Sequence, residues 1–388
     1  MSITDTSLQG RALQEGALQG RIATARAATL AWLDAMQADG LPRGVTRISA
    51  AHDAAAWPGV LLPGTYNGLL CRHLLNGMDD IPAAHLIDWL ESHRQQNGVF
   101  RIPGMHDDAV FKKPDPMETW RYIDFHVTNY TLGAIEALDA ARPPVLTFAL
   151  PFLDPPTLKA WLAERDLRDP WQEGNNIVNL GSFLLLLRRF GLPDAAVADI
   201  AIIDRSMAIL FAWHERLQEP ATGFWGVGQL SDPRAALYAM AGSMHNFHLW
   251  YTTARPLPFQ DKAVDYALAQ ATGIDSACID VDLVDLLVHA HMLIDHRRIE
   301  TDAWLRAKLV ALLDFQNEDG GFADERDGLR GQDGWVRGYE EPQGLSNTFA
   351  TWFRWIAIAM IADLLWPGWR RWNFRRMIGI GYRLECRA

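Results

Sequence analysis

Apolar residues recur at helical spacing along nearly the whole chain. Two clear examples are AAHLIDWLESHRQQNG at residues 83–98 and WLRAKLVALLDFQNEDGG at residues 304–321. Runs in which apolar and polar residues alternate, as they do in half-buried strands, are sparse. The pattern therefore predicts an all-α protein.

One set of predicted helices is amphipathic and stops at a glycine followed by an aromatic residue. The stops are RQQNGVF (94–100), EPATGFWG (219–226) and QNEDGGF (316–322). One charged face and a C-terminal glycine are typical of helices on the outside of a domain. We expect such outer helices at about residues 19–38, 81–96, 156–168, 200–217, 259–273 and 302–317.

A second set begins with a polar cluster and then becomes apolar on nearly all sides. These helices are expected to start near Thr65, Asp124, Asn175, Met244, Ile279 and Ser346. Helices that are apolar all round lie in the middle of a structure, so we interpret them as inner helices. Outer and inner candidates alternate along the chain in pairs.

Six such pairs predict a closed α/α toroid, an (α/α)6 barrel formed by residues 1–368 as a single domain. An irregular helical bundle and an open solenoid are the alternatives. An open solenoid would expose apolar faces at both ends and would more often keep a constant repeat length. If all inner helices run the same way, their polar N-terminal ends meet at one mouth of the ring, where free backbone N–H groups also gather.

Charge and composition narrow the classes of molecule that this protein is expected to bind. Forty-seven acidic residues against thirty-six basic ones give a net charge of −11, which disfavours nucleic acid and anionic lipid. The sixteen tryptophans favour an aromatic-lined cavity or a core rich in rings. A small molecule or an oligosaccharide is therefore the expected partner.

The segment 369–388 differs from the rest, because arginines alternate there with aromatic and aliphatic residues in WRRWNFRRMIGIGYRLE. We interpret it as a basic aromatic strap packed on the body of the protein. Peripheral contact with a membrane surface is the alternative.

Three widely spaced cysteines and an opening without a basic or apolar leader favour a cytoplasmic protein. The most hydrophobic stretch, WFRWIAIAMIADLLWP at residues 352–367, is interrupted by Arg354 and Asp363. It is too short for a clean membrane span and is expected to be a buried helix. No cofactor and no metal are predicted.

Two carboxylates at the predicted mouth, Asp280 and Asp282, are the candidate acids. They lie at i and i+2 around a helix start, with Asp285 one turn further on. Carboxylates this close raise the pKa of one of them, which can keep an acid protonated near neutral pH. The alternative is that Asp280 is an N-cap and Asp282 a first-turn partner of the helix dipole.

His245 and His248, at i and i+3 in MHNFH, are candidates for acid/base work or polar binding, and a metal would need further ligands from neighbouring helices. A satisfied pair of core histidines is the alternative. Other polar groups at the inner helix starts are candidate substrate contacts, because amides in apolar helices are costly unless they are paired. They are Tyr66, Asn67, Asp124, His126, Asn129, Tyr130, Asn175, Asn176, Asn179 and Asn347, with Trp250, Trp335 and Trp352 as candidate aromatic walls.

The stop QNEDGGF resembles the Q-x-x-D-G-G-W/F repeat of the squalene cyclase and protein prenyltransferase superfamily, with QQNGVF and TGFWG as weaker copies. The resemblance implies an α/α toroid. It also implies that Asp280 and Asp282 match the first and middle aspartates of the cyclase D-x-D-D motif, the middle one being the acid, while Leu283 replaces the last. The Asp-x-Cys zinc pair of the prenyltransferases is not matched, because Cys278 precedes Asp280 here.

These observations leave three functions open. The first is an isoprenoid-handling enzyme similar to terpenoid cyclases, with Asp282 as general acid, Asp280 as the residue that tunes it, and aromatic faces that stabilise carbocations. The second is a carbohydrate-active enzyme, a polysaccharide lyase or a glycosidase, that uses the His/Asn/Asp-lined mouth with Glu340 and Glu341 beside it. The third is a non-catalytic binding toroid.

Overall fold

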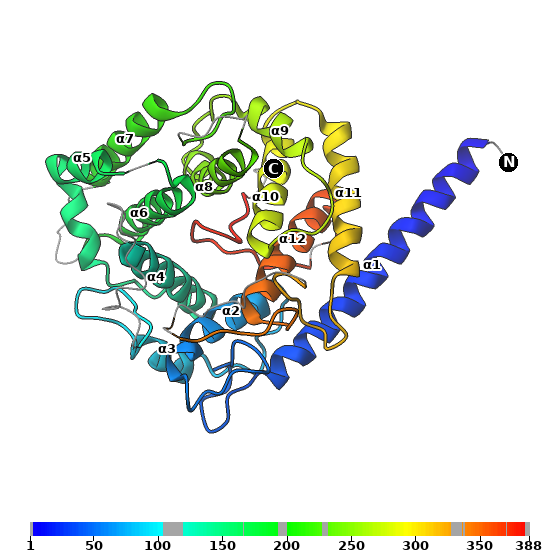
Figure 1. Ribbon diagram of the computed structural model, residues 1–388, viewed down its shortest axis with the longest axis horizontal. Helices are drawn as coiled ribbons and strands as arrows, with labels where there is room; N and C mark the ends of the chain where they lie inside the picture. The colour runs from blue at the N-terminus through cyan, green and yellow to red at the C-terminus, as the bar shows by residue number, and fades with distance from the viewer. Residues whose placement is uncertain are drawn as a thin grey trace.

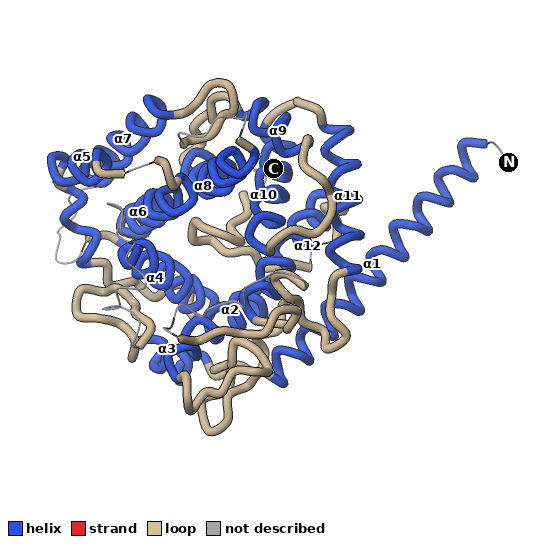
Figure 2. Tube along the Cα trace, in the orientation of Figure 1, coloured by secondary structure: helices blue, strands red, loops and turns tan. Residues whose placement is uncertain are grey.

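The computed structural model describes residues 3–103, 119–165, 167–192, 200–226, 232–326, 336, 338–369 and 371–384. Over these residues the elements are helices, and the only β pairs are isolated bridges such as Arg94 with Phe100. Figure 2 shows the helices joined by loops. The prediction of an all-α protein is confirmed.

The helices alternate between two sets along the chain (Figure 1). The inner helices are α2 (Leu61–Leu74), α4 (Thr119–Leu138), α6 (Pro170–Phe190), α8 (Pro233–Thr252), α10 (Ala277–Leu293) and α12 (Thr348–Leu365). The outer helices are α1 (Ile3–Ala35), α3 (Ala83–Glu91), α5 (Pro155–Ala163), α7 (Ile200–Leu217), α9 (Gln260–Leu268) and α11 (Arg298–Asp314), and two short 3₁₀ helices are η1 (Pro58–Val60) and η3 (Thr147–Leu153). Each inner helix packs against the next, and α12 packs against α2.

The outer helix α7 has the predicted bounds, but several other boundaries were predicted wrongly. Inner helix α8 begins at Pro233 and not near Met244, because the Asp232 side chain accepts hydrogen bonds from the N–H groups of Arg234 and Ala235 while proline occupies the first helical position. Asp169 and Pro170 begin α6 in the same way. The polar clusters that were expected to start α6 and α8 therefore lie one to three turns inside these helices.

The repeated glycine stops are close approaches of one backbone to another. Gly98 and Gly320 have φ of 97° and 94°, a left-handed conformation that favours glycine. A Cβ on Gly320 would lie 2.5 Å from the carbonyl oxygen of Ala28, and one on Gly98 would lie 2.2 Å from that of Val145. Gln316 of the same stop donates to the carbonyl oxygens of Gly320 and Ala25 at 2.8 and 3.0 Å. The stop thus joins the end of α11 to α1.

Helix α12 is buried along most of its length. It is long and apolar enough to cross a bilayer, but 78% of that stretch is buried inside the protein. The expectation of a buried helix agrees with this position. Its one arginine, Arg354, is fully buried and is neutralised by an ion pair described below.

Helices α6 and α8 approach closely through glycine. A Cβ on Gly174 would lie 2.3 Å from the carbonyl oxygen of Gly242, and one on Gly242 would lie 2.0 Å from that of Pro170. Backbone atoms cannot yield as a flexible side chain can, so a methyl group here would push the two helices apart.

Gly174→Ala is therefore expected to lower the free energy of unfolding by about 1–3 kcal/mol, in spite of the better helix propensity of alanine. Gly20 of α1 is the matched control, because a Cβ there meets nothing within 4 Å. Gly20→Ala should stabilise the protein by about 0.5–1 kcal/mol. Urea unfolding of both variants measures the difference, and equal midpoints would contradict this account of the α6–α8 contact.

The strap, residues 371–384 of the described chain, runs inside the circle of inner helices (Figure 1, red). Met377, Ile378, Ile380 and Tyr382 are buried there, so these apolar side chains do not face a membrane surface. The carbonyl oxygen of Ile378 accepts from Asn129 of α4 at 3.1 Å and from Ser182 of α6 at 3.2 Å. The strap is therefore bonded to two inner helices.

Candidate functional site

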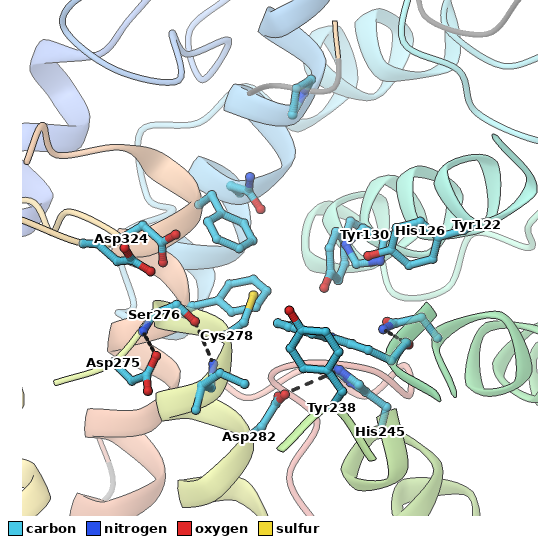
Figure 3. Close-up of a pocket in the computed structure, with 18 of the residues that line it drawn as sticks. Tyr122, His126, Tyr130, Tyr238, His245, Asp275, Ser276, Cys278, Asp282 and Asp324 are labelled. Atoms are coloured by element: carbon cyan, nitrogen blue, oxygen red, sulfur yellow. Dashed lines mark hydrogen bonds and ion pairs between the residues drawn. The ribbon is translucent and has the colours of Figure 1, made fainter. Parts of the chain in front are cut away.

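A cavity of about 590 Å³ lies where the N-terminal parts of the inner helices meet. All six inner helices contribute to its lining, together with the loops that precede α10 and α12. The volume is within the range of about 300–1,000 Å³ that is usual for small-molecule sites. Figure 3 shows side chains from opposite helices pointing toward this common space.

Aromatic rings form much of the cavity wall. They are Tyr66, Tyr122, Tyr130, Trp171, Tyr238, Phe349 and Phe353. Several pack on one another, with ring centroids 5.6 Å apart for Tyr66 and Tyr130 and 4.3 Å apart for Phe349 and Phe353. Contacts of this kind fix the ring faces, so the wall is pre-formed.

Asp282 is the carboxyl group that α10 presents to this cavity. Its side chain is 1% exposed, and neither of its oxygens has a hydrogen-bond partner among the described residues. Nε2 of His245 on α8 lies 3.8 Å from Oδ1 (Figure 3), too far for a hydrogen bond. Burial first, and then the charge of Asp285, raise the pKa of Asp282 well above its usual value and favour the neutral acid.

Two histidines face the same cavity. Burial lowers the pKa of His245 to about 3. Burial, with the nearby His245 and Arg375, lowers the pKa of His126 well below its usual value. Both imidazoles are therefore neutral bases at physiological pH.

Below Asp282, away from the cavity, His248, Asp285 and His289 form a buried cluster that we call the His–Asp–His hub. Oδ1 of Asp285 lies 2.8 Å from Nε2 of His248 and 2.8 Å from Nδ1 of His289. Burial alone would raise the pKa of Asp285, but the two imidazoles outweigh it and hold this pKa well below the usual range. Asp285 is consequently ionised.

The hub has residue types that bind metals, but its hydrogen bonds oppose that use. Its ligand atoms all lie within 4.8 Å of one another. However, the backbone N–H of Leu384 in the strap donates to Nε2 of His289 at 3.1 Å, which places the proton of this imidazole on Nδ1. The nitrogen that faces Asp285 is thus a donor without a free lone pair for a cation.

Asp280 does not line the cavity, and its predicted role beside Asp282 is wrong. Its carboxylate is fully buried between the Lys308 ammonium and the Arg354 guanidinium. Arg354 also donates to the carbonyl oxygens of Asp275 and Asp324, each at 2.7 Å. Asp280 and Asp282 do lie at a helix start, as their spacing predicts. The cations that pair with Asp280 come from two other helices, Lys308 from α11 and Arg354 from α12. This ion cluster positions the two loops at the rim of the cavity.

The structure brings seven of the predicted site residues to the cavity, namely Tyr66, Asn67, His126, Tyr130, Asn175, His245 and Asp282. His248 belongs to the hub instead. Trp335 lies outside the described residues. The others are buried elsewhere in the inner helices.

The polar residues away from the cavity have structural partners. The carboxylate of Asp124 accepts from Arg101 at 3.0 and 3.1 Å. Asn129 is bonded to Arg375 and to Ile378 of the strap. Asn347 caps α12 by accepting from the N–H of Ala350 at 2.7 Å. These three expected substrate contacts are therefore corrected to contacts within the fold.

The remaining four predicted contacts do not line the cavity and are buried between the helices. They are Asn176, Asn179, Trp250 and Trp352. Nδ2 of Asn176 donates to Glu173 at 3.1 Å, while Nδ2 of Asn179 has no partner among the described residues. Trp352 packs edge-on against Tyr130, with centroids 5.2 Å apart, so it supports a wall residue from behind. Trp250 packs against Phe211 on the outer side.

Residues that the sequence did not single out also line the cavity. Trp171 and Tyr238 lie in the first two turns of α6 and α8, before the predicted starts of these helices near Asn175 and Met244. The Asp-Pro pairs at 169–170 and 232–233 are the signal that marks the true starts. Asp275, Asp324 and Glu325 line the same cavity from the loops, and Arg234 is the one lysine or arginine among the described lining residues. The described part of the lining is therefore acidic.

No protein-family model matches the chain, and no curated protein matches it either. The function is consequently argued from the cavity itself.

The buried neutral histidines make the fold sensitive to acid. Burial lowers the pKa of His214 to about 3, as it does for His245, from the usual histidine pKa of 6.5. A group with a lowered folded pKa contributes stability that is complete above about pH 6.5 and is lost as the pH falls toward 3. Between these two pH values, each such histidine adds up to about 1.4 kcal/mol per pH unit to the slope of the unfolding free energy against pH.

His214→Gln is expected to flatten the dependence of the unfolding free energy on pH between 6 and 4 by about that slope. Chemical denaturation at several pH values measures it. The exposed His85 provides the control, since His85→Gln should leave the slope unchanged. A slope that is the same in the His214 variant and the wild type would refute the burial argument.

Proposed function

We propose that the six inner helices and six outer helices form a closed (α/α)6 toroid with its site at one mouth. Support comes from the chain of contacts between successive inner helices, which returns from α12 to α2. The cavity is lined from the N-terminal parts of all six inner helices, as expected if they run in the same direction.

We propose further that this protein acts on an isoprenoid by acid-initiated carbocation chemistry. The observation that carries the proposal is Asp282, a buried carboxyl group without a hydrogen-bond partner, held neutral in a cavity walled by aromatic rings. A neutral acid in a cavity walled by aromatic rings can protonate an alkene or an epoxide, which is a weak base. Aromatic faces can then stabilise the cation that forms.

The proposed reaction balances as an isomerisation. The O–H bond of Asp282 breaks and a C–H bond forms on the alkene, whose π electrons take up the proton and leave a tertiary cation. The π electrons of a second alkene attack this cation and form a C–C bond. A neutral imidazole, His126 or His245, takes the final proton from carbon, and its weak basicity suffices because a carbocation is very acidic. The imidazole returns its proton to Asp282 before the next turnover, and for His245 the present 3.8 Å between Nε2 and Oδ1 must shorten to hydrogen-bond distance for this transfer.

The carbohydrate alternative has less support from the lining. A lyase would need positive groups to neutralise a uronate, whereas Asp275, Asp324 and Glu325 face the cavity. A glycosidase could pair one of these with Asp282, which keeps that alternative in the experiment. Glu341 is buried and accepts from the Tyr339 hydroxyl at 2.8 Å, and neither it nor Glu340 lines the cavity.

A direct ligand comparison tests the proposal. Native mass spectrometry with C15 and C20 prenyl alcohols and epoxides, prenyl diphosphates and acidic oligosaccharides should show binding of the uncharged isoprenoids. Turnover in D₂O should then give a product with one deuterium on carbon, derived from Asp282. Binding of oligosaccharides in the absence of isoprenoid binding would favour the glycosidase instead, and binding without turnover would favour a non-catalytic toroid.

A further inference from the structure

Helices α8 and α10 share a ladder of ionisable groups that descends from the cavity to the strap. At the top, Nε2 of His245 lies 3.8 Å from Oδ1 of Asp282. Below it, Oδ1 of Asp285 lies 2.8 Å from Nε2 of His248 and 2.8 Å from Nδ1 of His289. Asp282, Asp285 and His289 follow one face of α10 because they are spaced by three and four residues. All of these side chains are buried.

The lower part of the ladder is fixed by a directed set of hydrogen bonds. Leu384 N–H donates to Nε2 of His289, and Nδ1–H of His289 donates both to Oδ1 and to the backbone carbonyl of Asp285. Nε2–H of His248 gives Oδ1 a second donor. A carboxylate that accepts two N–H bonds is favoured over the acid, so the negative charge stays on Asp285.

The upper part of the ladder is different, because Asp282 receives no such donor. The charged form of Asp282 would be buried one turn, about 4.5 Å of helix rise, from a carboxylate that is already ionised. The other titratable groups facing the ladder are Cys278 beside Asp282, His126 beside His245, and Tyr251, Tyr382 and Arg383 around His289. Of these, Arg383 is the permanent cation, and it pairs with Asp363 at 3.2 Å.

We propose that Asp285, held ionised by His248 and His289, is a positioning residue whose negative charge keeps the proton on Asp282 until substrate takes it. This inference rests on the proposed function, since it assigns Asp282 the role of acid. It also gives the strap a part in the site, because Leu384 fixes the tautomer of His289.

Infrared spectroscopy can follow the proton on Asp282 without any substrate. The C=O stretch of the buried acid is the band that disappears in Asp282→Asn, and its intensity is titrated against pH. In Asp285→Asn the midpoint of this titration should fall by at least about one pH unit, because a like charge has been removed. The alkaline limb of the pH–rate profile should move in the same direction.

His248→Phe provides a second variant, from the other helix, in case Asp285→Asn does not fold. Phenylalanine has no N–H, so Asp285 loses one donor. Its charged form is then less favoured, and the midpoint of the Asp282 titration should again fall. Asp295→Asn, which alters a carboxylate that is 93% exposed, is the matched control and should leave the band unchanged. A midpoint that does not move in a folded Asp285 or His248 variant would overturn the inference.

The same data separate this inference from the proposed function. A shifted midpoint without isoprenoid turnover would support the coupling between the two aspartates and reject the reaction. Turnover with an unshifted midpoint would retain the reaction and reject the role of Asp285. Absence of the band from the wild-type protein would reject both.

Discussion

Asp282→Asn should reduce proton-initiated turnover by about 10²- to 10⁴-fold, the usual contribution of a general acid. Asparagine has nearly the shape of the neutral acid but carries no acidic proton. Because the folded state favours the neutral form of Asp282, the substitution should not unfold the protein. The measurement is product formation in D₂O by the purified variant and the wild type.

The direction in which Asp282→Asn changes the free energy of unfolding also follows from the raised pKa. The pKa of Asp282 in the folded state is raised above the usual aspartate pKa of 3.8. Its contribution to stability is therefore full below that pH and is lost as the pH rises. Asp282→Asn should therefore unfold less readily than the wild type at pH 7 and lose this part of the pH dependence. Asp295→Asn is the control for both readouts. Undiminished turnover in the Asp282 variant would contradict the assignment of Asp282 as the general acid.

Asp280→Asn should destabilise the protein by about 3–5 kcal/mol, because it leaves two buried cations without their counter-ion. The side chains of Lys308 and Arg354 are 1% and 0% exposed, so water cannot replace the carboxylate. Arg354 also holds the rim segments that carry Asp275 and Asp324, and the cavity should widen there. Urea unfolding with an unchanged m-value measures the loss.

The matched control is the same chemical change in an exposed ion pair. Asp314 pairs with Arg21 at 2.5 Å, with exposed fractions of 63% and 46%. Asp314→Asn should cost less than about 1 kcal/mol. Equal losses for the two substitutions would show that the Asp280 cluster is not the buried ion network described above.

Local sequence patterns predicted the helices because the relevant contacts are local. The first glycine of QNEDGGF, Gly320, has a left-handed conformation, and a mostly apolar stretch such as α12 indicates burial on nearly every side. The polar cluster MHNFH predicts a start of α8 near Met244, but the Asp232–Pro233 cap begins the helix eleven residues earlier.

The chemistry was harder to predict because it depends on long-range contacts. Asp280 and Asp282 look alike in sequence, and the residues that separate their roles, Lys308 and Arg354, lie 28 and 74 positions away from Asp280. Asp285 was visible as a third carboxylate, but its partner His248 lies on another helix. Helical spacing shows which residues share a face, and it does not show which cation that face meets.

The strap is synthesised after every inner helix, and this order has a consequence for folding in the cell. Until residues 371–384 emerge from the ribosome, Asn129 lacks its bonds to Ile378 and Arg375, and His289 lacks the N–H of Leu384. Helices α4, α6 and α10 then expose polar groups that the finished protein buries. A nascent chain stalled before the strap should consequently be held by chaperones or degraded, however completely its helices have formed.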